Sequence, residues 1–243
     1  MFKEKEIHND NIEDQWVKLV NEDVKELILP YISKFVKFKK CPSCGSSNLS
    51  KEFIHQGLNY ESCDNCNLLF INPFPPEEIK TNYIIKSKAL KMWREAIVNL
   101  KSRKNLYVDR VEYLENFLHS CFKKNNRKLT ILEIGAGNGE LIKVLLNNFN
   151  HLIENIIVIE PQPLEIKNEK IIYVQGILDE NISKKFTDRC DLVLAFEVLE
   201  HILYPNKFLN LISKVLKVSG LFALSTPNGW SIETQLQTIK SRN

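Results

Sequence analysis

The sequence predicts an α/β fold, with a mostly parallel β-sheet flanked by helices in the second half of the chain. Three observations support this prediction. Short apolar runs alternate with helical segments from about residue 128 onward, as in parallel strands that are buried on both faces. A glycine-rich turn follows the first of these runs. The first half instead carries two pairs of cysteines and several amphipathic segments, which predict a small module and helices ahead of the sheet.

The composition excludes several classes of protein. The chain has 243 residues, 44% of them hydrophobic and 26% charged, so it can build a sizeable core and is neither disordered nor repetitive. A formal net charge of only +3 excludes nucleic-acid binding that is driven by bulk charge. No apolar run approaches the roughly 18 residues of a membrane span, and the first residues carry no apolar signal segment. We therefore expect a cytoplasmic protein that does not engage membranes.

The apolar spacing divides the chain into four parts. We expect an N-terminal helical extension (1–37), a cysteine module (38–72), a helical linker or lid (73–126) and the α/β core (127–243). Before the core, the expected elements are a helix over 11–29 that ends at Pro30, short strands over 51–55 and 68–71, and helices between 77 and 125. In the core, they are strands over 129–134, 156–159, 171–174, 192–196 and 221–224, and helices over 139–149 and 205–218.

Four of the six cysteines form two closely spaced pairs. Their pattern, C-x2-C-x18-C-x2-C, has the spacing of a four-thiolate zinc site in which each pair forms a tight turn. Gly45 and Asn67 follow the two pairs, and these residue types best tolerate the positive φ that such turns often need. Since all four ligands would be sulfurs, the zinc ion would be structural, in a zinc-ribbon-like module. The predicted ligands are Cys41, Cys44, Cys63 and Cys66.

Two alternatives exist for these four cysteines, namely two disulfides or four unrelated thiols. The absence of an export signal disfavours the disulfides, because disulfides persist mainly in oxidising compartments. Cys121 and Cys190 lie outside the pattern, and we expect both to be ordinary buried thiols.

A glycine-rich turn follows the first predicted strand of the core. Three of the chain's eight glycines fall within residues 135–139, so this turn needs backbone freedom or a ligand that lies against its main chain. Such a turn exposes the amino end of the next helix to a ligand, although glycines alone also fit a dinucleotide-binding turn. Two acidic residues make the pattern more specific. Glu133 precedes the turn, and Glu160 ends the second strand, where a carboxylate can accept both hydroxyls of a ribose.

These segments resemble the class I S-adenosylmethionine-dependent methyltransferases, whose core is a Rossmann-like sheet. Residues 133–139 (EIGAGNG) resemble the first motif of that family, and residues 157–161 (IVIEP) its second. Residues 191–202 (DLVLAFEVLEHI) resemble the fourth-strand motif of a large subgroup. The resemblance covers about residues 128–228 and implies S-adenosyl-L-methionine as the cofactor.

The resemblance also implies roles for single residues. The glycine turn would contact the methionine part of the cofactor, Glu160 its ribose, and Phe196 the region near the sulfonium. Gly176 and Ile177 stand where the family places a contact to the adenine edge; the usual aspartate is absent, which leaves this contact to the backbone and the Ile177 side chain. The full set of implied cofactor-binding residues is Glu133, Gly135, Ala136, Gly137, Asn138, Gly139, Glu160, Pro161, Gly176, Ile177, Phe196 and Glu197.

The N-terminal half resembles that of methyltransferases which act on sugars or nucleotide-linked sugars in carbohydrate biosynthesis. The resemblance rests on a four-cysteine module, the segment LFINP at residues 69–73 and the helices that follow. Tyr83 lies where related sugar C-methyltransferases place active-site tyrosines. Ile84 and Ile85 interrupt the tyrosine-rich pattern, so C-methylation and O-methylation both remain open.

His201, just past the fourth core strand, is the predicted general base. Methyl transfer to a hydroxyl or carbon acid benefits from a group that titrates near neutral pH, as an imidazole does. The alternative is a residue at a helix start that the backbone satisfies. Its neighbour Glu200 could orient the base, bind a substrate hydroxyl or cap a helix.

The chain has 18 residues after Ser225, too few for the antiparallel hairpin that completes the seven-stranded sheet of the resembled family. We therefore expect a C-terminally truncated or split methyltransferase, with an exposed sheet edge that a protein partner or a second copy covers.

Other functions remain open at this point. Methylation of RNA or of another small molecule is one, and the basic stretch 86–104 is its sole hint. A truncated, noncatalytic zinc-containing binding module is another. A nicotinamide-dependent dehydrogenase is disfavoured by Glu133 and by the Glu200–His201 pair.

Overall fold

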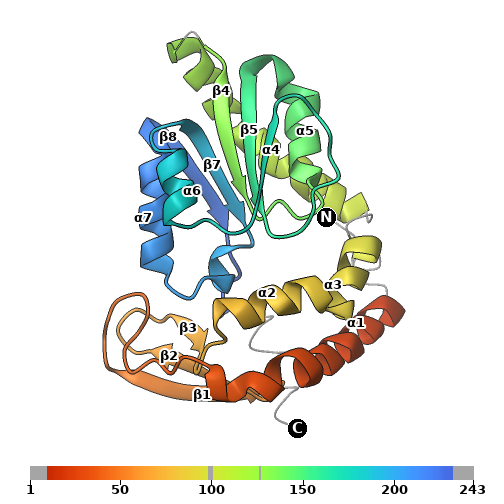
Figure 1. Cartoon of the computed structure of the whole chain (residues 1–243), viewed down its shortest axis with the longest axis vertical. Helices are drawn as coiled ribbons and strands as arrows, with labels where there is room; N and C mark the ends of the chain where they lie inside the picture. The colour runs from red at the N-terminus through yellow and green to blue at the C-terminus, as the bar shows by residue number, and fades with distance from the viewer. Residues whose placement is uncertain (1–9, 98–100, 126, 232–243) are drawn as a thin grey trace. The chain divides into compact units, whose positions relative to one another are not determined.

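The computed structural model describes residues 10–97, 101–125 and 127–231, and the chain divides into two compact units (Figure 1). Among the described residues, one unit joins residues 10–93 to residues 203–206 and 227–231. The other, the α/β unit, comprises residues 94–202 and 207–226. The boundaries of the four parts that the sequence suggests remain predictions. In the part of the chain that is described, no helix has both the length and the apolar character needed to cross a membrane.

The first unit begins with a helix close to the predicted range of 11–29. Helix α1 (Asp10–Asp23) continues through a π-helical turn, η2 (Val24–Ile28), so the helix ends within one residue of the predicted position. Pro30 lies in the first turn of a separate 3₁₀ helix, η3 (Leu29–Lys34), where its missing N–H breaks no hydrogen bond. Asp23 is buried, and its Oδ2 accepts hydrogen bonds from Ser87 Oγ (2.6 Å) and Ala89 N (2.8 Å).

The cysteine module is a three-stranded antiparallel sheet in the order β1-β2-β3 (Leu49–His55, Leu58–Cys63 and Leu69–Ile71). The sequence analysis predicted the first and third strands and missed β2. The missed signal is the dipeptide Gln56-Gly57, in which both residues have positive φ (52° and 79°), as a two-residue hairpin turn requires. Two short helices follow, α2 (Glu77–Lys86) and α3 (Lys88–Met92), and then a π-helical turn, η4 (Trp93–Ile97).

The α/β unit is a five-stranded parallel sheet in the order β6-β5-β4-β7-β8, which confirms the predicted fold class. From β4 the chain steps outward to β5 and β6, then returns to the other side of β4 to form β7 and β8. The strands are β4 (Leu129–Ile134), β5 (Ile153–Glu160), β6 (Ile171–Gln175), β7 (Cys190–Phe196) and β8 (Leu216–Ser225). The helices are α4 (Lys101–Asn125), α5 (Glu140–Phe149), α6 (Glu180–Lys185) and α7 (Pro205–Val215).

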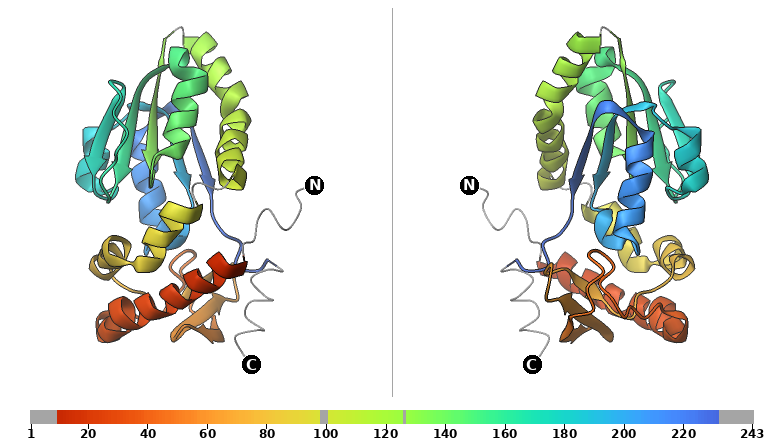
Figure 2. Two further views of the ribbon diagram at one scale, coloured as in Figure 1. Left: turned by 90° about the vertical axis from the view of Figure 1, so that its right-hand side faces the viewer. Right: turned by 90° about the vertical axis from the view of Figure 1, so that its left-hand side faces the viewer.

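Helices cover both faces of this sheet (Figure 2). Alternate residues of β4 point to opposite sides, as the pleat of a strand requires: Ile131 packs with α4 and α5, and Leu132 packs with α6 and α7. This double coverage explains why the central strands are apolar at nearly every position.

The boundary between the last helix and the last strand of the core differs from the prediction, and one short helix was missed. The helix predicted over 205–218 ends at Val215, and the strand predicted over 221–224 begins at Leu216, so β8 is longer than expected. The early part of β8 is irregular, with Ser219 at a φ of 66°. In the sequence, Ser219 also interrupts the apolar run, so the prediction started only after it. Helix α6 was missed because six residues are too few to show a period, although Asp179 caps it by accepting from Ile182 N (2.8 Å).

An ion-pair network lies at the amino end of the strands, away from the predicted site. Asp191, near the start of β7, is buried and accepts from both Arg127 Nη atoms (3.0 and 2.6 Å), from Lys217 Nζ (2.9 Å) and from Thr130 N (2.9 Å). Burial acts to raise the pKa of Asp191, but these donors outweigh it and hold the pKa below its usual value. Asp191 therefore stabilises the fold.

Candidate functional site

The predicted cofactor residues of the core gather at the carboxyl ends of β4, β5, β6 and β7. The strand order reverses next to β4, and in open parallel sheets a ligand binds beyond the strand ends at such a reversal. Figure 1 shows β4 and β5 side by side, with the turn to α5 at their shared end.

The glycine turn between β4 and α5 is built from left-handed backbone. Gly135, Gly137 and Gly139 have φ values of 75°, 55° and 73°, and Gly139 is the N-cap residue that precedes α5. A side chain at Gly135 would bring a Cβ within 2.7 Å of Val198 Cγ2. A Cβ at Gly137 would instead meet nothing within 4 Å, so its main chain is open to a ligand.

Glu160, the last residue of β5, is buried beside this turn. Its Oε2 accepts from Gly137 N (3.0 Å) and its Oε1 from Gln162 N (3.0 Å). Burial raises its pKa, although the two amides and the charge of Arg94 act in the opposite direction. Each carboxylate oxygen has two lone pairs, so Glu160 keeps the capacity to accept further hydrogen bonds.

Glu133, on β4, is buried more deeply and is less well satisfied. Only 5% of its surface is exposed, and its Oε2 has no hydrogen-bond partner in the described part of the chain. Desolvation, reinforced by the charge of Glu160, raises its pKa to about 8, against a smaller opposing effect of Arg110. A buried carboxyl oxygen without a donor can bind a cation or a hydrogen-bond donor from a ligand.

Arg110 of α4 organises the end of β7. Its guanidinium lies over the Phe196 ring, 4.6 Å from the centroid, and its Nη2 is 3.2 Å from both Glu197 Oε1 and Ser225 Oγ. Ser225 Oγ also donates to Glu197 Oε1 (2.6 Å). Glu197 has a φ of 56°, so this network holds an unfavourable backbone conformation directly after the strand. Phe196 is thereby fixed at the predicted site.

Glu200 and His201 lie in a short 3₁₀ helix, η6 (Leu199–His201), which follows β7 after Glu197 and Val198. His201 is exposed, and its amide donates to Val198 O (3.0 Å). Glu200 Oε2 accepts from Thr226 Oγ1 (3.2 Å), and burial raises the pKa of Glu200. An exposed imidazole and a partly buried carboxyl group are thus adjacent in one turn.

The end of β6 contributes Gly176 and Ile177, as predicted. Gly176 N donates to Glu160 O (3.1 Å), and a Cβ on Gly176 would meet nothing within 4 Å. Ile177 leaves 44% of its surface exposed. Pro161 O, in the chain that leaves β5, accepts from Gln175 Nε2 (3.1 Å). This strand end is therefore an open, partly apolar surface.

Tyr83, the predicted catalytic tyrosine, is placed in the first unit on α2. Its ring packs against the apolar cluster of Val24, Ile28 and Ile79. Burial raises the pKa of Tyr83, Ser87 lowers it and the charge of Asp23 raises it further. The structure accounts for Tyr83 as a packing residue of its own unit, and its catalytic role remains a prediction.

Sequence reasoning missed two residues of this edge, Arg110 and Ser225. Arg110 is one of many basic residues in a helical stretch, but it stands next to Val111 on the apolar face of α4. A cation on the buried face of a helix is the signal that could have identified it. Ser225 is the last residue of β8, and a strand-end position is its only signal.

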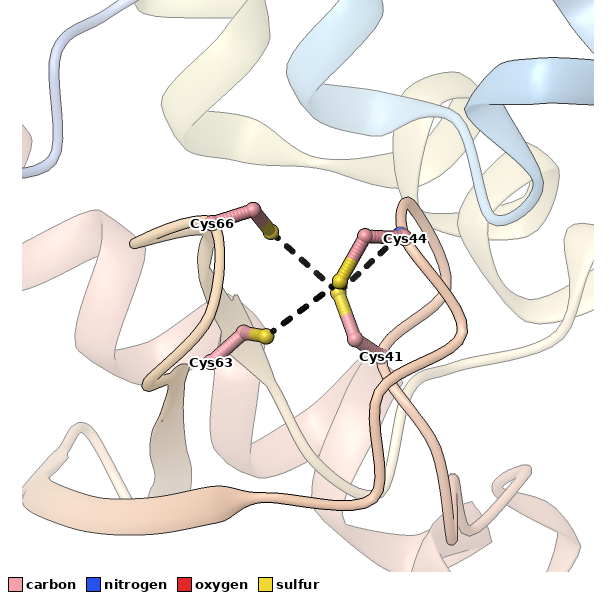
Figure 3. A group of neighbouring side chains, drawn as sticks. All are labelled: Cys41, Cys44, Cys63 and Cys66. Carbon is pink, nitrogen blue, oxygen red and sulfur yellow. Dashed lines mark hydrogen bonds between the residues drawn. The ribbon is translucent and has the colours of Figure 1, made fainter.

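The four predicted zinc ligands converge in the cysteine module (Figure 3). Their sulfurs all lie within 4.8 Å of one another; Cys41 and Cys66 Sγ are 3.6 Å apart, and Cys44 and Cys63 Sγ 3.5 Å apart. A tetrahedral ion with Zn–S bonds of about 2.3 Å requires sulfurs about 3.8 Å apart. The four cysteines therefore fit a zinc ion.

The turns and the electrostatics of this cluster agree with a cation site. Gly45 and Asn67 have φ values of 77° and 57°, as predicted. The Ser46 amide lowers the pKa of Cys44 to about 6. The Leu68 amide also acts to lower the pKa of Cys66, but desolvation and the other sulfurs outweigh it and raise that pKa to about 12. Four thiols this close cannot all ionise without a cation among them.

Comparison with known proteins places the chain among methyltransferases. The protein family described as "Methyltransferase domain" matches residues 106–243. A relative from Rhodopseudomonas palustris (strain TIE-1), named ubiquinone biosynthesis O-methyltransferase, is 27% identical over 133 residues, which cover 49% of this chain and 50% of the relative. A relative of the same name from Rickettsia akari (strain Hartford) is 30% identical over 125 residues and covers 49% and 48%. The chain thus spans about half the length of these curated relatives.

One solved structure gives the same fold. The plantazolicin methyltransferase BpumL, in complex with a monoazolic desmethylPZN analog and SAH, matches with a TM-score of 0.51 and 16% identity. The match covers 67% of this chain and 63% of that one, and at this identity it speaks for the fold alone.

Proposed function

We propose a function for this chain, which belongs to the methyltransferase domain family and has the class I fold. It would transfer a methyl group from S-adenosylmethionine to a small-molecule acceptor. One observation carries the proposal: two buried carboxyl groups, Glu133 and Glu160, flank an open glycine turn at the strand reversal. This is the arrangement that a ligand with an ammonium group and a ribose requires.

The residues at this edge fit the cofactor group by group. The unpartnered Glu133 oxygen suits the ammonium of the methionine part, and the open backbone at Gly137 lets that part approach. Glu160 would accept the ribose hydroxyls, and Ile177 would cover the adenine. Phe196, held under the Arg110 guanidinium, would border the reacting sulfur.

The bound cofactor supplies a methyl group that is already activated on a positively charged sulfur. The protein must then align the acceptor with the methyl carbon and exclude water. We assign His201 as the group that accepts the proton of an acceptor hydroxyl, while the new O–C bond replaces the C–S bond. Glu200, held by Thr226, would orient that imidazole or the acceptor.

The acceptor class is a finer proposal. The name of the curated relatives supports an acceptor oxygen, and therefore O-methylation. A sugar or nucleotide-linked sugar, which the N-terminal half suggested, finds no support in those names and stays a prediction. C-methylation at a site that includes Tyr83 also finds no support in those names and stays a prediction.

We further propose that Cys41, Cys44, Cys63 and Cys66 hold a structural zinc ion. The sulfur spacing supports this proposal. Because all four ligands are protein sulfurs, the ion would stabilise the module without taking part in methyl transfer.

The test uses the zinc-loaded chain. S-adenosylhomocysteine is titrated by calorimetry, and transfer of labelled methyl is then measured with phenolic and nucleotide-sugar acceptors. We expect His201→Ala to leave cofactor affinity unchanged and to lower turnover roughly 100-fold. His151→Ala, at another exposed histidine, is the matched control. A folded, zinc-loaded chain that binds no cofactor would instead favour the noncatalytic binding module, and methylation of RNA alone would favour the RNA alternative.

A further inference from the structure

Two short segments leave the α/β unit and pack with the cysteine module. Residues 203–206 follow η6, which holds Glu200 and His201, and the chain from Pro227 follows Thr226. Both segments belong to the same compact unit as the four cysteines. Ile202 alone separates the first segment from His201, and the second segment follows Thr226, whose Oγ1 donates to Glu200 Oε2 (3.2 Å).

The first segment contacts the first cysteine turn. Asn206 Nδ2 donates to Ser43 O (2.7 Å), and Ser43 lies between Cys41 and Cys44. The Tyr204 ring meets Phe38 edge to face, with centroids 6.1 Å apart. The position of the Ser43 carbonyl is set by the same tight turn that directs the two sulfurs inward.

The second segment contacts the other cysteine turn. Trp230 Nε1 donates to Asn67 O (2.6 Å), and Asn67 follows Cys66 in the left-handed conformation. Gly229 lies flat on Leu69, since a Cβ there would come within 2.9 Å of Leu69 Cδ2. One hydrogen bond therefore reaches each of the two turns that would enclose the metal.

We propose that Asn206 and Trp230 are positioning residues. Asn206 would fasten the segment that follows His201 to one metal-holding turn, and Trp230 would fasten the segment that follows Thr226, the hydrogen-bond partner of Glu200, to the other. This inference rests on the proposed function for its catalytic consequence. A metal ion bound by all four sulfurs would hold both turns in one conformation, because each turn supplies two of its ligands. Metal loading would then order the general base without any contact between metal and substrate.

The distinguishing measurement is hydrogen exchange of residues 199–206 and 226–231 in the full chain. We expect these amides to exchange roughly tenfold faster in Asn206→Asp and in Trp230→Phe, with zinc content unchanged, because each variant loses one donor. Chelation with 1,10-phenanthroline is expected to speed exchange in both segments of the unsubstituted chain.

Matched controls separate this role from general destabilisation. Asn210→Asp makes the same change on the exposed face of α7. Trp16→Phe removes an indole N–H that has no acceptor among the described residues. Neither control is expected to alter exchange in the two segments.

The kinetic arm follows from the same variants. We expect kcat to fall about tenfold in Asn206→Asp and Trp230→Phe, while the Kd for S-adenosylhomocysteine stays constant. Unchanged exchange in the two zinc-loaded variants would overturn the inference. Because exchange does not depend on turnover, it decides the matter even if no methyl transfer is found, and the failure of the proposed function would appear separately as absent cofactor binding.

Discussion

Buried carboxyl groups at the two ends of the parallel sheet differ in their ion pairs and in the direction of their pKa shifts. At the amino end, Asp191 is paired with Arg127 and Lys217, and these donors lower its pKa against the effect of burial. At the carboxyl end, Glu133 and Glu160 form no ion pair with any described residue, and burial raises the pKa of both. A buried acidic residue that forms ion pairs with other residues of the chain stabilises the fold. A similarly buried acidic residue without an ion pair is available to a ligand.

The largest expected effect is on stability, at the paired end. Asp191→Ala removes the acceptor of the Thr130 amide and of two cations, so we expect the free energy of unfolding to fall by about 3 kcal/mol near pH 7. Because the folded pKa is lowered, this stabilisation is present above the unfolded pKa and is lost as the pH falls through the folded value. Urea unfolding of the parent and the variant at pH 7 and in acid measures the loss of stability and its dependence on pH. An equal loss at all pH values would contradict the ionic origin.

The next effect is on ligand binding, at the unpaired end. Glu160→Ala is expected to weaken S-adenosylhomocysteine by about 1 to 3 kcal/mol, or roughly 5- to 150-fold in Kd, because the ribose hydroxyls lose their acceptor. Calorimetry gives the Kd directly, and far-UV circular dichroism checks that the variant keeps its secondary structure. An unchanged Kd would remove Glu160 from the cofactor site.

A pH-dependent effect sharpens the comparison at Glu133. Its folded pKa lies near 8, above its unfolded value, so the ligand-free chain loses stability as the pH rises between the two values. Glu133→Gln cannot ionise, and we expect its melting temperature to exceed that of the parent increasingly from pH 6 to pH 9. The two proteins should converge toward pH 5. A difference that is independent of pH would show that Glu133 is already charged in the folded chain.

The smallest expected effect on stability is at Arg127, the partly exposed partner of Asp191 at the amino end of the sheet. Arg127 keeps much of its side chain in solvent, so Arg127→Ala should cost less than about 1 kcal/mol of stability and leave cofactor affinity unchanged. Thermal unfolding in low and high salt measures this, and the difference should shrink in high salt. A loss as large as that of Asp191→Ala would mean that Arg127 alone carries the network.

The sequence was sufficient for the features that depend on local pattern. Fully apolar runs identified the central strands because both faces of β4, β5 and β7 are covered, and the spacing of the cysteines placed all four sulfurs in one cluster. Glu133 and Glu160 were placed near the ends of their strands because each stands at or next to the end of an apolar run, while their role at the cofactor stays a prediction.

Features that depend on pairing between distant segments were not accessible. Arg110 reaches Ser225 across 115 positions, and Asp191 meets Arg127 across 64, so no local period reveals either contact. Asp191 stood in the predicted fourth-strand motif, yet its position at the start of the strand places it at the opposite end from the ligand edge. Short elements such as α6 were missed because six residues show no helical period.

The most direct test of the account is the affinity of S-adenosylhomocysteine for the zinc-loaded chain, compared among the parent, Glu160→Ala and Asp191→Asn. The account predicts that the parent binds, that Glu160→Ala binds at least about fivefold more weakly, and that Asp191→Asn loses stability but keeps the parent's affinity at temperatures where it is folded. Equal affinities in the parent and Glu160→Ala, or a folded parent that does not bind, would contradict the claim that the unpaired acidic end is the cofactor site.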